Sequence, residues 1–193
     1  MRVIAGSAGG IQLQVPKRGV RPTMDRVKAA IFSSLGDKLI NARVLDLFAG
    51  SGALGIEALS RGAASVLFVD QDRQAVASIE KNLAKAKLRA AVRQQDVFRF
   101  LRGSTAPASF DIILADPPYE KTEDGERFTE KLLTDEALPA LLSRDGILVL
   151  EKHPDEELRE FAFWNLIRAK RYGATEVLFL APANRQSAVE NQN

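Results

Sequence analysis

The segment Asp116-Pro117-Pro118-Tyr119 contains the residues of this chain that are best suited to chemistry. It directly follows the apolar run 110–115, and doubly wound folds place their ligand sites at the carboxyl ends of parallel strands. The Asp116 carboxylate and the Pro117 carbonyl can accept the two N–H bonds of an exocyclic base amine, which directs the nitrogen lone pair outward. The prolines restrict the turn, and Tyr119 can stack on a base. We predict that these four residues are catalytic; the alternative is a rigid turn without a ligand.

A glycine-rich turn runs from Asp46 to Gly55, where a strand is expected to meet a helix. Gly50 and Gly52 permit close backbone approach by a nucleotide-like ligand. The same run contains G-x-G-x-x-G, which equally suggests a dinucleotide-dependent oxidoreductase. Asp46 favours another ligand, because its charge would repel a pyrophosphate but attract the sulfonium and amino groups of S-adenosylmethionine. We predict S-adenosylmethionine as the cofactor; a purely structural role for Asp46, as an acceptor that braces the loop, stays open.

Two further acids follow the next expected strands. Asp70 ends the second strand, from where a carboxylate can accept the ribose hydroxyls of either cofactor. Asp96 could accept the adenine amino group with Val97 or Phe98 packed on the ring, or it could cap a short helix that ends near Leu101. Both roles of Asp96 remain open. The candidate cofactor-binding residues are Asp46, Phe48, Gly50, Ser51, Gly52, Asp70, Gln71, Asp96 and Val97.

Short apolar runs alternate with amphipathic stretches from Val44 onward, which indicates a repeated strand–helix pattern. The expected parallel strands are 44–48, 65–70, 90–94, 110–115 and 146–151. The expected helices are 53–61, 72–86, 126–133, 136–142 and 155–160. Residues 165–170 and 175–181 predict a final antiparallel pair, since no helix fits between them. This is the layout of the class I S-adenosylmethionine-dependent methyltransferases, a Rossmann-like doubly wound α/β sheet with a C-terminal antiparallel hairpin, although other doubly wound folds share much of it.

The N-terminal part of the chain is basic. Residues 1–28 hold six basic side chains and one acidic one, a net charge of +5 against −3 for the rest. We expect a small hairpin of residues 2–5 and 11–15 followed by a helix from about Thr23, and a division into an extension (1–37), a catalytic domain (38–182) and a disordered tail (183–193). A basic extension suits RNA phosphates, although a solvated arm is an equal alternative. The candidate RNA-binding residues are Lys17, Arg18, Arg21, Arg26 and Lys28.

Composition excludes several other classes of protein. The chain has no cysteine and a single histidine, His153, so disulfide scaffolds, thiolate catalysis and histidine-rich metal sites are excluded. We also expect no metal, because the sulfonium of the predicted cofactor already supplies the leaving group. No apolar run approaches the roughly 20 residues that span a bilayer, and we expect a soluble cytoplasmic protein.

Beyond these patterns, the sequence resembles a known family, the RsmD-like methyltransferases that modify the N2 amino group of a guanine in bacterial small-subunit (16S) ribosomal RNA. The resemblance covers nearly the whole chain. It rests on the segments Arg2-Val-Ile-Ala-Gly6, Arg21-Pro-Thr-Met-Asp-Arg-Val27, Asp46 to Gly62, Asp116 to Tyr119 and Tyr172-Gly-Ala-Thr175.

The resemblance implies a role for each matched position. It implies that Asp46, Gly50, Gly52 and Asp70 line the cofactor pocket, that Asp96 lies near the adenine, and that Asp116 to Tyr119 hold the guanine. It also implies a 16S rRNA partner, within the small subunit or its assembly intermediate, and we expect a monomer. One departure weakens a phosphate-binding role for the first turn: 7–11 carry no charge, where the family has an Arg-Gly-Arg-like turn.

Three other functions remain open at the level of sequence. Methylation of adenine N6, or of DNA, could use the same Asp-Pro-Pro-Tyr segment. The glycine turn alone would suit an oxidoreductase, and a non-catalytic RNA-binding module could keep the same fold.

Overall fold

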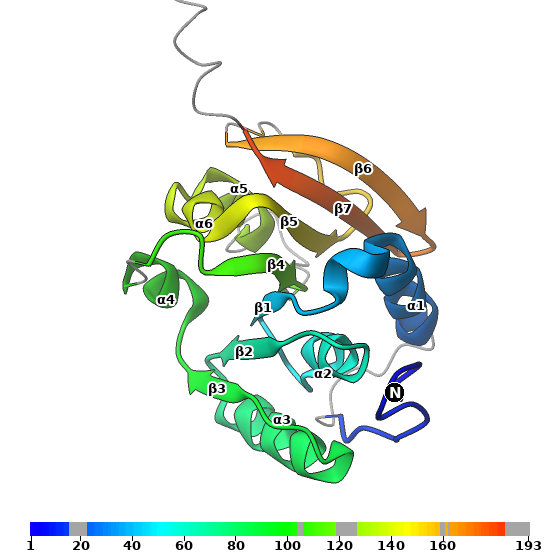
Figure 1. Ribbon diagram of the computed structural model, residues 1–193. Helices are drawn as coiled ribbons and strands as arrows, with labels where there is room; N and C mark the ends of the chain where they lie inside the picture. Colours follow the sequence, from blue (N-terminus) through cyan, green and yellow to red (C-terminus); the bar gives the residue numbers. More distant parts are fainter. Residues whose placement is uncertain (16–22, 104–105, 119–126, 159–160, 162, 184–193) are drawn as a thin grey trace, which may run out of the picture.

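The computed structural model describes residues 1–15, 23–103, 106–118, 127–158, 161 and 163–183 (Figure 1). One sheet lies between two layers of helices. In chain order the elements are α1 (Thr23–Leu35), the 3-10 helix η1 (Gly36–Leu39), β1 (Arg43–Leu47), α2 (Ala53–Ser60), β2 (Ser65–Asp70), α3 (Arg73–Ala86), β3 (Ala91–Gln94), α4 (Val97–Gly103), β4 (Phe110–Ala115), α5 (Phe128–Thr134), α6 (Ala137–Ala140), β5 (Leu142–Lys152), β6 (Trp164–Tyr172) and β7 (Thr175–Pro182).

The sheet has the strand order β3-β2-β1-β4-β5-β7-β6. The first five of these strands are parallel, and β7 is antiparallel to both β5 and β6. The strand order reverses between β1 and β4, the position at which doubly wound sheets open a crevice at their carboxyl edge. The predicted class I methyltransferase layout, with its C-terminal antiparallel hairpin, is confirmed.

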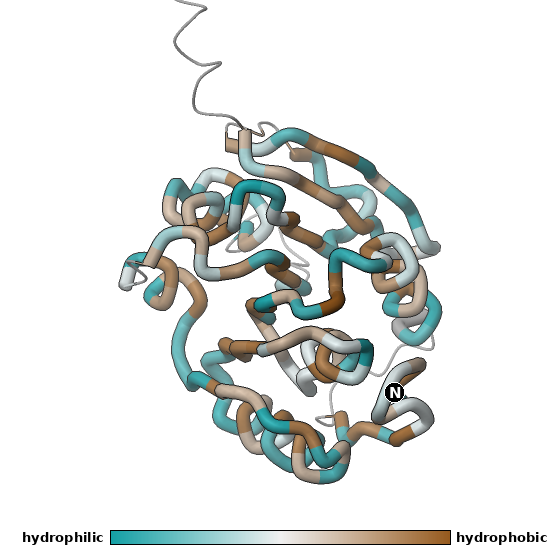
Figure 2. The backbone as a smooth tube through the Cα atoms, in the orientation of Figure 1, coloured by the Kyte–Doolittle hydropathy of each residue, from teal (hydrophilic) through white to brown (hydrophobic). Residues whose placement is uncertain are grey.

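Alternate residues of the central strands feed two separate cores. One face of the sheet packs against α1, α2 and α3, and the other packs against α4, α5 and α6 (Figure 1). Figure 2 shows hydrophobic residues gathered along the central strands. Strand residues of the first core include Val44, Phe68, Leu114, Val149 and Val177, and those of the second include Leu45, Leu47, Ile113, Ala115 and Leu150.

The predicted N-terminal hairpin forms only in part. Its two arms meet in a single bridge, Arg2 to Gln12, with the Val3 N–H donating to the Ile11 carbonyl at 2.9 Å. Beyond the bridge the first arm turns to α2 instead, because the Ser60 hydroxyl donates to the Ala5 carbonyl at 2.6 Å. Val3 and Leu13 belong to the same core as α1 and α2, so the extension packs as part of the sheet's helical layer. The boundary at residue 37 stays a prediction, and 184–193 lie outside the described residues.

Glu57 of α2 is the buried acid that holds this N-terminal segment in place. Its carboxylate accepts the backbone N–H groups of Ile4 at 2.7 Å and Ala5 at 3.1 Å. It also pairs with Arg61 at 2.6 Å and with Lys28 at 3.5 Å. The Glu57 side chain has no exposure to solvent, so each of these donors replaces water that the carboxylate lost on folding.

Two sequence expectations near the end of the chain were wrong. The helix expected at 155–160 is absent over 155–158, where the chain turns after Pro154. The buried Lys152 Nζ donates to the carbonyls of His153 at 2.9 Å and Glu156 at 2.8 Å, which holds the segment as a loop. β5 also begins at Leu142 rather than at 146, because an irregular register between Phe110 and Ile112 of β4 lets the pairing extend backwards.

Within the described residues, no helix is long and apolar enough to cross a membrane. The same part of the chain shows no group of three or more metal-ligating side chains.

Replacing Glu57 with glutamine should destabilise the protein by about 3 kcal/mol, because Lys28 and Arg61 would lose a buried counter-charge. Urea denaturation of the variant measures the loss in the free energy of unfolding. Glu80→Gln, on the exposed side of α3, is the matched control and should change little. An equal effect of both substitutions would show that Glu57 does not hold the N-terminal segment.

Candidate active site at the carboxyl edge of the sheet

The turn between β1 and α2 brings the backbone close to the sheet edge. Gly50 and Gly52 have φ angles of +55° and +76°, which glycine adopts at no steric cost. A Cβ atom on Gly52 would lie 3.1 Å from the Ile79 side chain, so a larger residue would also crowd α3. Phe48 has a φ of +55° without being glycine, a strained conformation of the kind that gathers at functional sites.

Asp46 braces this turn from inside the sheet. Its Oδ2 accepts the Gly55 N–H at 2.9 Å, in the first turn of α2, where Gly52 has no side chain to cap the helix. Burial raises the pKa of Asp46 well above its usual range, and the charges of Asp116 and Asp70 raise it further. The bracing role left open from sequence is therefore confirmed. A carboxylate at this helix terminus also takes the place where a pyrophosphate would bind, which disfavours the dinucleotide alternative.

Asp70 connects the glycine turn to the end of β2. Its Oδ2 accepts the Gly50 N–H at 2.8 Å, and its Oδ1 accepts the Asp72 N–H at 2.8 Å. Each carboxylate oxygen can accept more than one hydrogen bond, so these bonds orient the group while leaving acceptor capacity for ribose hydroxyls. Gln71, the next residue, is exposed at the same edge.

Asp96 caps α4, since its Oδ1 accepts the Arg99 N–H at 2.8 Å. The capping role is therefore confirmed, and an adenine contact through the remaining oxygen stays a prediction. Val97 packs in the second core with 2% exposure, whereas Phe98 is half-buried. Of the two side chains considered for the adenine ring, Phe98 is thus the one that a ligand can reach.

Three phenylalanines form an aromatic group beside Asp96. Phe98 and Phe128 stack with their ring centroids 6.1 Å apart, and Phe48 lies 5.5 Å from Phe128. The Lys131 Nζ lies 5.7 Å from the Phe128 centroid. An adjoining hollow of about 450 Å³ is lined by Asp96, Phe98, Arg102, Lys131, Thr134 and Asp135. Sequence analysis missed Phe128, because α5 contributes it from a distant part of the chain.

Asp116 and Pro117 leave β4 directly beside the glycine turn. Leu47, the last residue of β1, pairs with Ala115, the last residue of β4, so the two turns begin at the same level on neighbouring strands. Neighbouring strands lie about 4.8 Å apart. Asp116 is half-buried and Pro117 is buried. Tyr119 lies outside the described residues.

Glu151 is an acid of this edge that sequence analysis missed. Leu150 of β5 pairs with Ala115, so Glu151 is the residue next to Asp116 on the neighbouring strand. Burial raises the pKa of Glu151 well above its usual range, as do the charges of Asp116 and Asp46. The available sequence signal was this acidic residue directly after the apolar run 146–150, which we interpreted only as the last residue of a strand.

The candidate RNA-binding residues divide into three groups. Arg26 is exposed on α1, and Lys17, Arg18 and Arg21 lie outside the described residues. Lys28 was wrong as a phosphate contact, because its side chain is only 3% exposed. Its Nζ donates to the Arg2 carbonyl and pairs with Glu57. Burial lowers the pKa of Lys28, and this lysine serves the fold instead.

Ser51 and Asn82 bring the N-terminal segment up to the glycine turn. The Asn82 Nδ2 donates to the Ser51 carbonyl at 2.9 Å and to the Gln14 carbonyl at 2.8 Å, and the Asn82 Oδ1 accepts the Gln14 N–H at 2.7 Å. Asn82 is fully buried on the apolar face of α3. The available sequence signal for this contact was a polar residue, Asn82, on the side of an amphipathic helix where apolar residues are expected.

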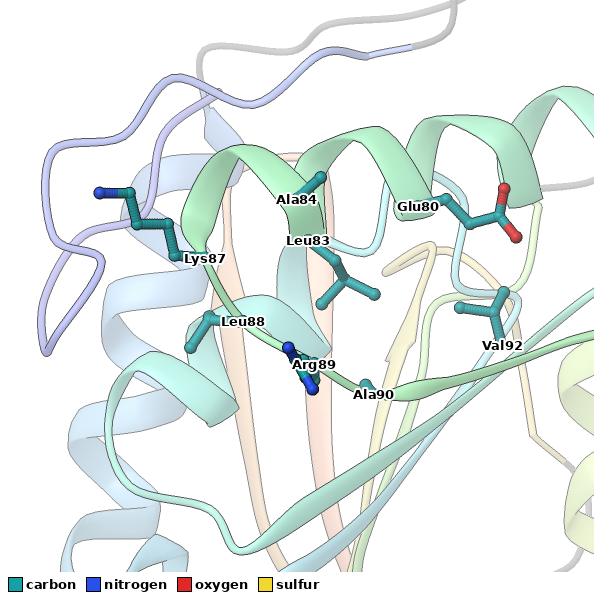
Figure 3. Close-up of a pocket in the computed structure, with 8 residues that line it drawn as sticks. All are labelled: Glu80, Leu83, Ala84, Lys87, Leu88, Arg89, Ala90 and Val92. Carbon is teal, nitrogen blue, oxygen red and sulfur yellow. The ribbon is translucent and has the colours of Figure 1, made fainter.

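A larger hollow, of about 710 Å³, lies away from this site (Figure 3). Its lining comes from the end of α3, with Glu80 and Leu83, and from the amino end of β3, with Arg89 and Val92. The candidate site is at the opposite, carboxyl end of the strands. The hollow carries none of the acids or glycines described above, so we do not include it.

Comparison with known proteins agrees with this geometry. Residues 1–181 match the model of the family described as Conserved hypothetical protein 95. A candidate rRNA methyltransferase of Bacillus subtilis, YlbH, is 40% identical over 92% of this chain and 96% of its own length. The Escherichia coli protein named ribosomal RNA small subunit methyltransferase D is 36% identical over 90% of this chain and 85% of its own length.

Solved structures share the fold. A candidate methyltransferase of Escherichia coli, yhhF, is 33% identical, and 94% of this chain matches 97% of that one with a TM-score of 0.76. A more distant methyltransferase fold, 15% identical with a TM-score of 0.67 over 83% of this chain and 50% of that one, was solved with S-adenosylhomocysteine (SAH). The predicted cofactor, S-adenosylmethionine, agrees with the methyltransferase names of these relatives. The resemblance found in the sequence is confirmed, and the chain belongs to the Conserved hypothetical protein 95 family, the RsmD family of methyltransferases.

Proposed function

We propose that this protein transfers a methyl group from S-adenosylmethionine to the exocyclic N2 amino group of a guanine in small-subunit (16S) ribosomal RNA. The observation that carries the proposal is the pairing of Leu47 with Ala115. It starts the glycine turn and the Asp116 turn at one level of one sheet edge, so a methyl donor over the first faces an amine held by the second.

The residues of the edge would divide the work. Asp70 would accept the ribose hydroxyls, Phe98 would pack on the adenine, and Asp46, with the glycine turn, would face the positively charged half of the cofactor. Asp116 and the Pro117 carbonyl would accept the N–H bonds of the amine, whose lone pair is otherwise delocalised into the ring. The methyl group would pass from sulfur to nitrogen, with the carbon–sulfur bond breaking as the carbon–nitrogen bond forms, and the methylated amine would lose one proton to the Asp116 carboxylate.

The RNA would approach from the basic N-terminal side. Arg26 is exposed there, and Lys17, Arg18 and Arg21 remain candidates for phosphate contacts. A guanine would have to leave its stack to reach Asp116, which suits a loop of single-stranded RNA. We infer that the protein acts as a monomer on the small subunit or on an assembly intermediate of it.

The test is methyl transfer into small-subunit particles from cells that lack this protein. Incubation with labelled S-adenosylmethionine should give N2-methylguanine as the labelled nucleoside, identified by mass spectrometry. Label in adenine alone would overturn the assignment of the base.

Asp116→Asn should lower kcat by about 100-fold or more, because the amide oxygen carries no negative charge and cannot take up the amine proton. SAH affinity, measured by calorimetry, should stay close to wild type and serves as the control for folding.

The preference for the charged cofactor over its neutral product should depend on pH. The raised pKa of Asp46 means that this carboxyl becomes ionised only as the pH climbs above the usual carboxyl range, and the ionised form is the one that attracts a sulfonium. The ratio of the SAH Kd to the S-adenosylmethionine Kd should therefore rise as the pH climbs above the usual carboxyl range, and it should level off once Asp46 is ionised. The two ligands differ only in the methyl group and the positive charge at sulfur, and the methyl group does not titrate, so the pH dependence of the ratio reports on the charge. Calorimetry measures both constants; Asp46→Asn should flatten the profile, and a flat wild-type profile would refute the role of Asp46.

A further inference from the structure

Four acids at the sheet edge project from one face of the sheet. Side chains two residues apart along a strand point to the same face. The residues two positions before Asp46, Asp70, Asp116 and Glu151 all lie in the core shared with α1, α2 and α3; they are Val44, Phe68, Leu114 and Val149. The pairing of Glu151 with Val177, a residue of the same core, agrees with this assignment.

The order of these acids follows the order of the strands. Asp70 on β2 and Asp46 on β1 lie under the glycine turn, Asp116 follows β4, and Glu151 is on β5. With about 4.8 Å between strands, Glu151 is one strand from Asp116 and two from Asp46. Glu151 thus lies on the far side of Asp116 from the cofactor turn, where the rest of a base held by Asp116 would extend.

We propose that Glu151 is a specificity-determining residue that accepts the N1–H of the target guanine. The inference rests on the proposed function. In guanine the N2 amine and the neighbouring N1–H are all donors, so two adjacent carboxylates complement them. In adenine the N1 next to the amine is an acceptor, which a carboxylate repels. A site built to accept this N–H discriminates strongly against a base that lacks it.

The partial burial of Glu151 supports such discrimination. Its side chain is half-buried at the end of the strand next to the half-buried Asp116, and the charges of Asp116 and Asp46 raise its pKa together with burial. Water compensates less well there than at the surface for a carboxylate that faces the lone pair of N1. Cofactor binding supports the required ionised form, because a sulfonium near this edge favours the charged state of all the acids around it.

The test compares guanine with 2-aminopurine, which keeps the 2-amino group but has an unprotonated N1. Reconstituted small-subunit particles would carry either base at the target position mapped by mass spectrometry. Wild-type enzyme should prefer guanine in kcat/KM by about 100-fold. Glu151→Gln should reduce that preference to about tenfold or less, because the amide can donate to N1, while its SAH affinity stays near wild type. Asp145→Asn, an exposed acid at the opposite end of β5, is the matched control and should keep the full preference.

The outcomes separate the two proposals. An unchanged base preference in Glu151→Gln, or a matching loss of SAH affinity, would overturn the role of Glu151 while leaving the proposed function intact. Absence of N2-methylguanine in the wild-type reaction would overturn the proposed function itself.

A second, independent feature is the edge strand β6. Its residues 165–171 are all exposed, and they include three basic and no acidic side chains. Leu166 and Ile167 are 48% and 56% exposed. Three basic side chains and no acidic one give this strand a positive charge, which complements a polyanion such as RNA.

The register of β6 connects it to the candidate site. Lys170 pairs with Val177, which pairs in turn with Glu151, so Lys170 is at the level of the acidic edge, two strands away. Arg168 pairs with Phe179, and both Val177 and Phe179 face the core of α1. Arg168 and Lys170 therefore project from the face that carries the acids, and α1 lies beside this end of the hairpin (Figure 1).

We propose that Arg168 and Lys170 bind phosphates of the substrate RNA next to the target nucleotide. The backbone of RNA whose base reaches Asp116 would continue along the edge of the sheet, past β7 and toward β6. Because the proposal concerns RNA binding alone, it holds whichever base is methylated. The double variant Arg168→Glu with Lys170→Glu should raise KM for the particle by about tenfold or more and leave kcat unchanged. The dependence of log kcat/KM on log salt should become shallower by about one to two units.

The control is a second charge reversal of the same size, Lys81→Glu with Arg89→Glu, on α3 and at the far hollow of Figure 3. It should leave KM within about twofold and the salt dependence unchanged. Equal effects of the two double variants would overturn a specific role for β6. A concentration-dependent dimer in sedimentation experiments that the β6 variant abolishes would also overturn it, since the strand would then bind a second copy of the chain.

Discussion

The register of the parallel strands is the constraint on which the candidate site depends. Leu47 pairs with Ala115, and Ala115 pairs with Leu150, so the turns after β1 and β4 and the end of β5 emerge at one level. Apolar residues two positions earlier hold each acid on the same face, because they must reach the core below. A shift of one residue in either pairing would bury the acids of one strand on the opposite face. The same strand register therefore determines both the packing of the core and the geometry of the candidate site.

The N-terminal segment is attached to this framework by polar contacts rather than by strand pairing. Glu57, Ser60 and Asn82 supply buried acceptors and donors for the backbone of residues 4–14. Gly6 has to be glycine, because a Cβ there would lie 1.8 Å from the Ser60 carbonyl oxygen. The result places the backbone of residues 4–14 against α2 and close to the glycine turn. Two separate segments of the resemblance, near residue 6 and near residue 60, thus form one contact.

Sequence patterns predicted the parallel strands, the terminal hairpin and the turn residues, because periodicity and glycine spacing are local properties. Side-chain environment was harder to predict. Lys28 was assigned to RNA because it lies in a basic stretch, yet the acid that pairs with it comes from α2, 29 residues later. Glu151 was missed because its partner Asp116 is on another strand. The helix expected at 155–160 is absent because Lys152, a residue outside that segment, donates to the carbonyl of Glu156 within it and to that of His153 just before it.

The acids clustered at one edge of the sheet favour a positively charged ligand over a neutral one. Burial and the neighbouring carboxylates raise the pKa values of Asp46 and Glu151, so the acids of this edge resist full ionisation. A sulfonium relieves this repulsion, but the thioether left after methyl transfer does not, since the positive charge has gone with the methyl group and then with the amine proton. In the proposed function, these acids should therefore bind the neutral product less firmly than the methyl donor, and the charge change of the reaction would favour exchange of the product.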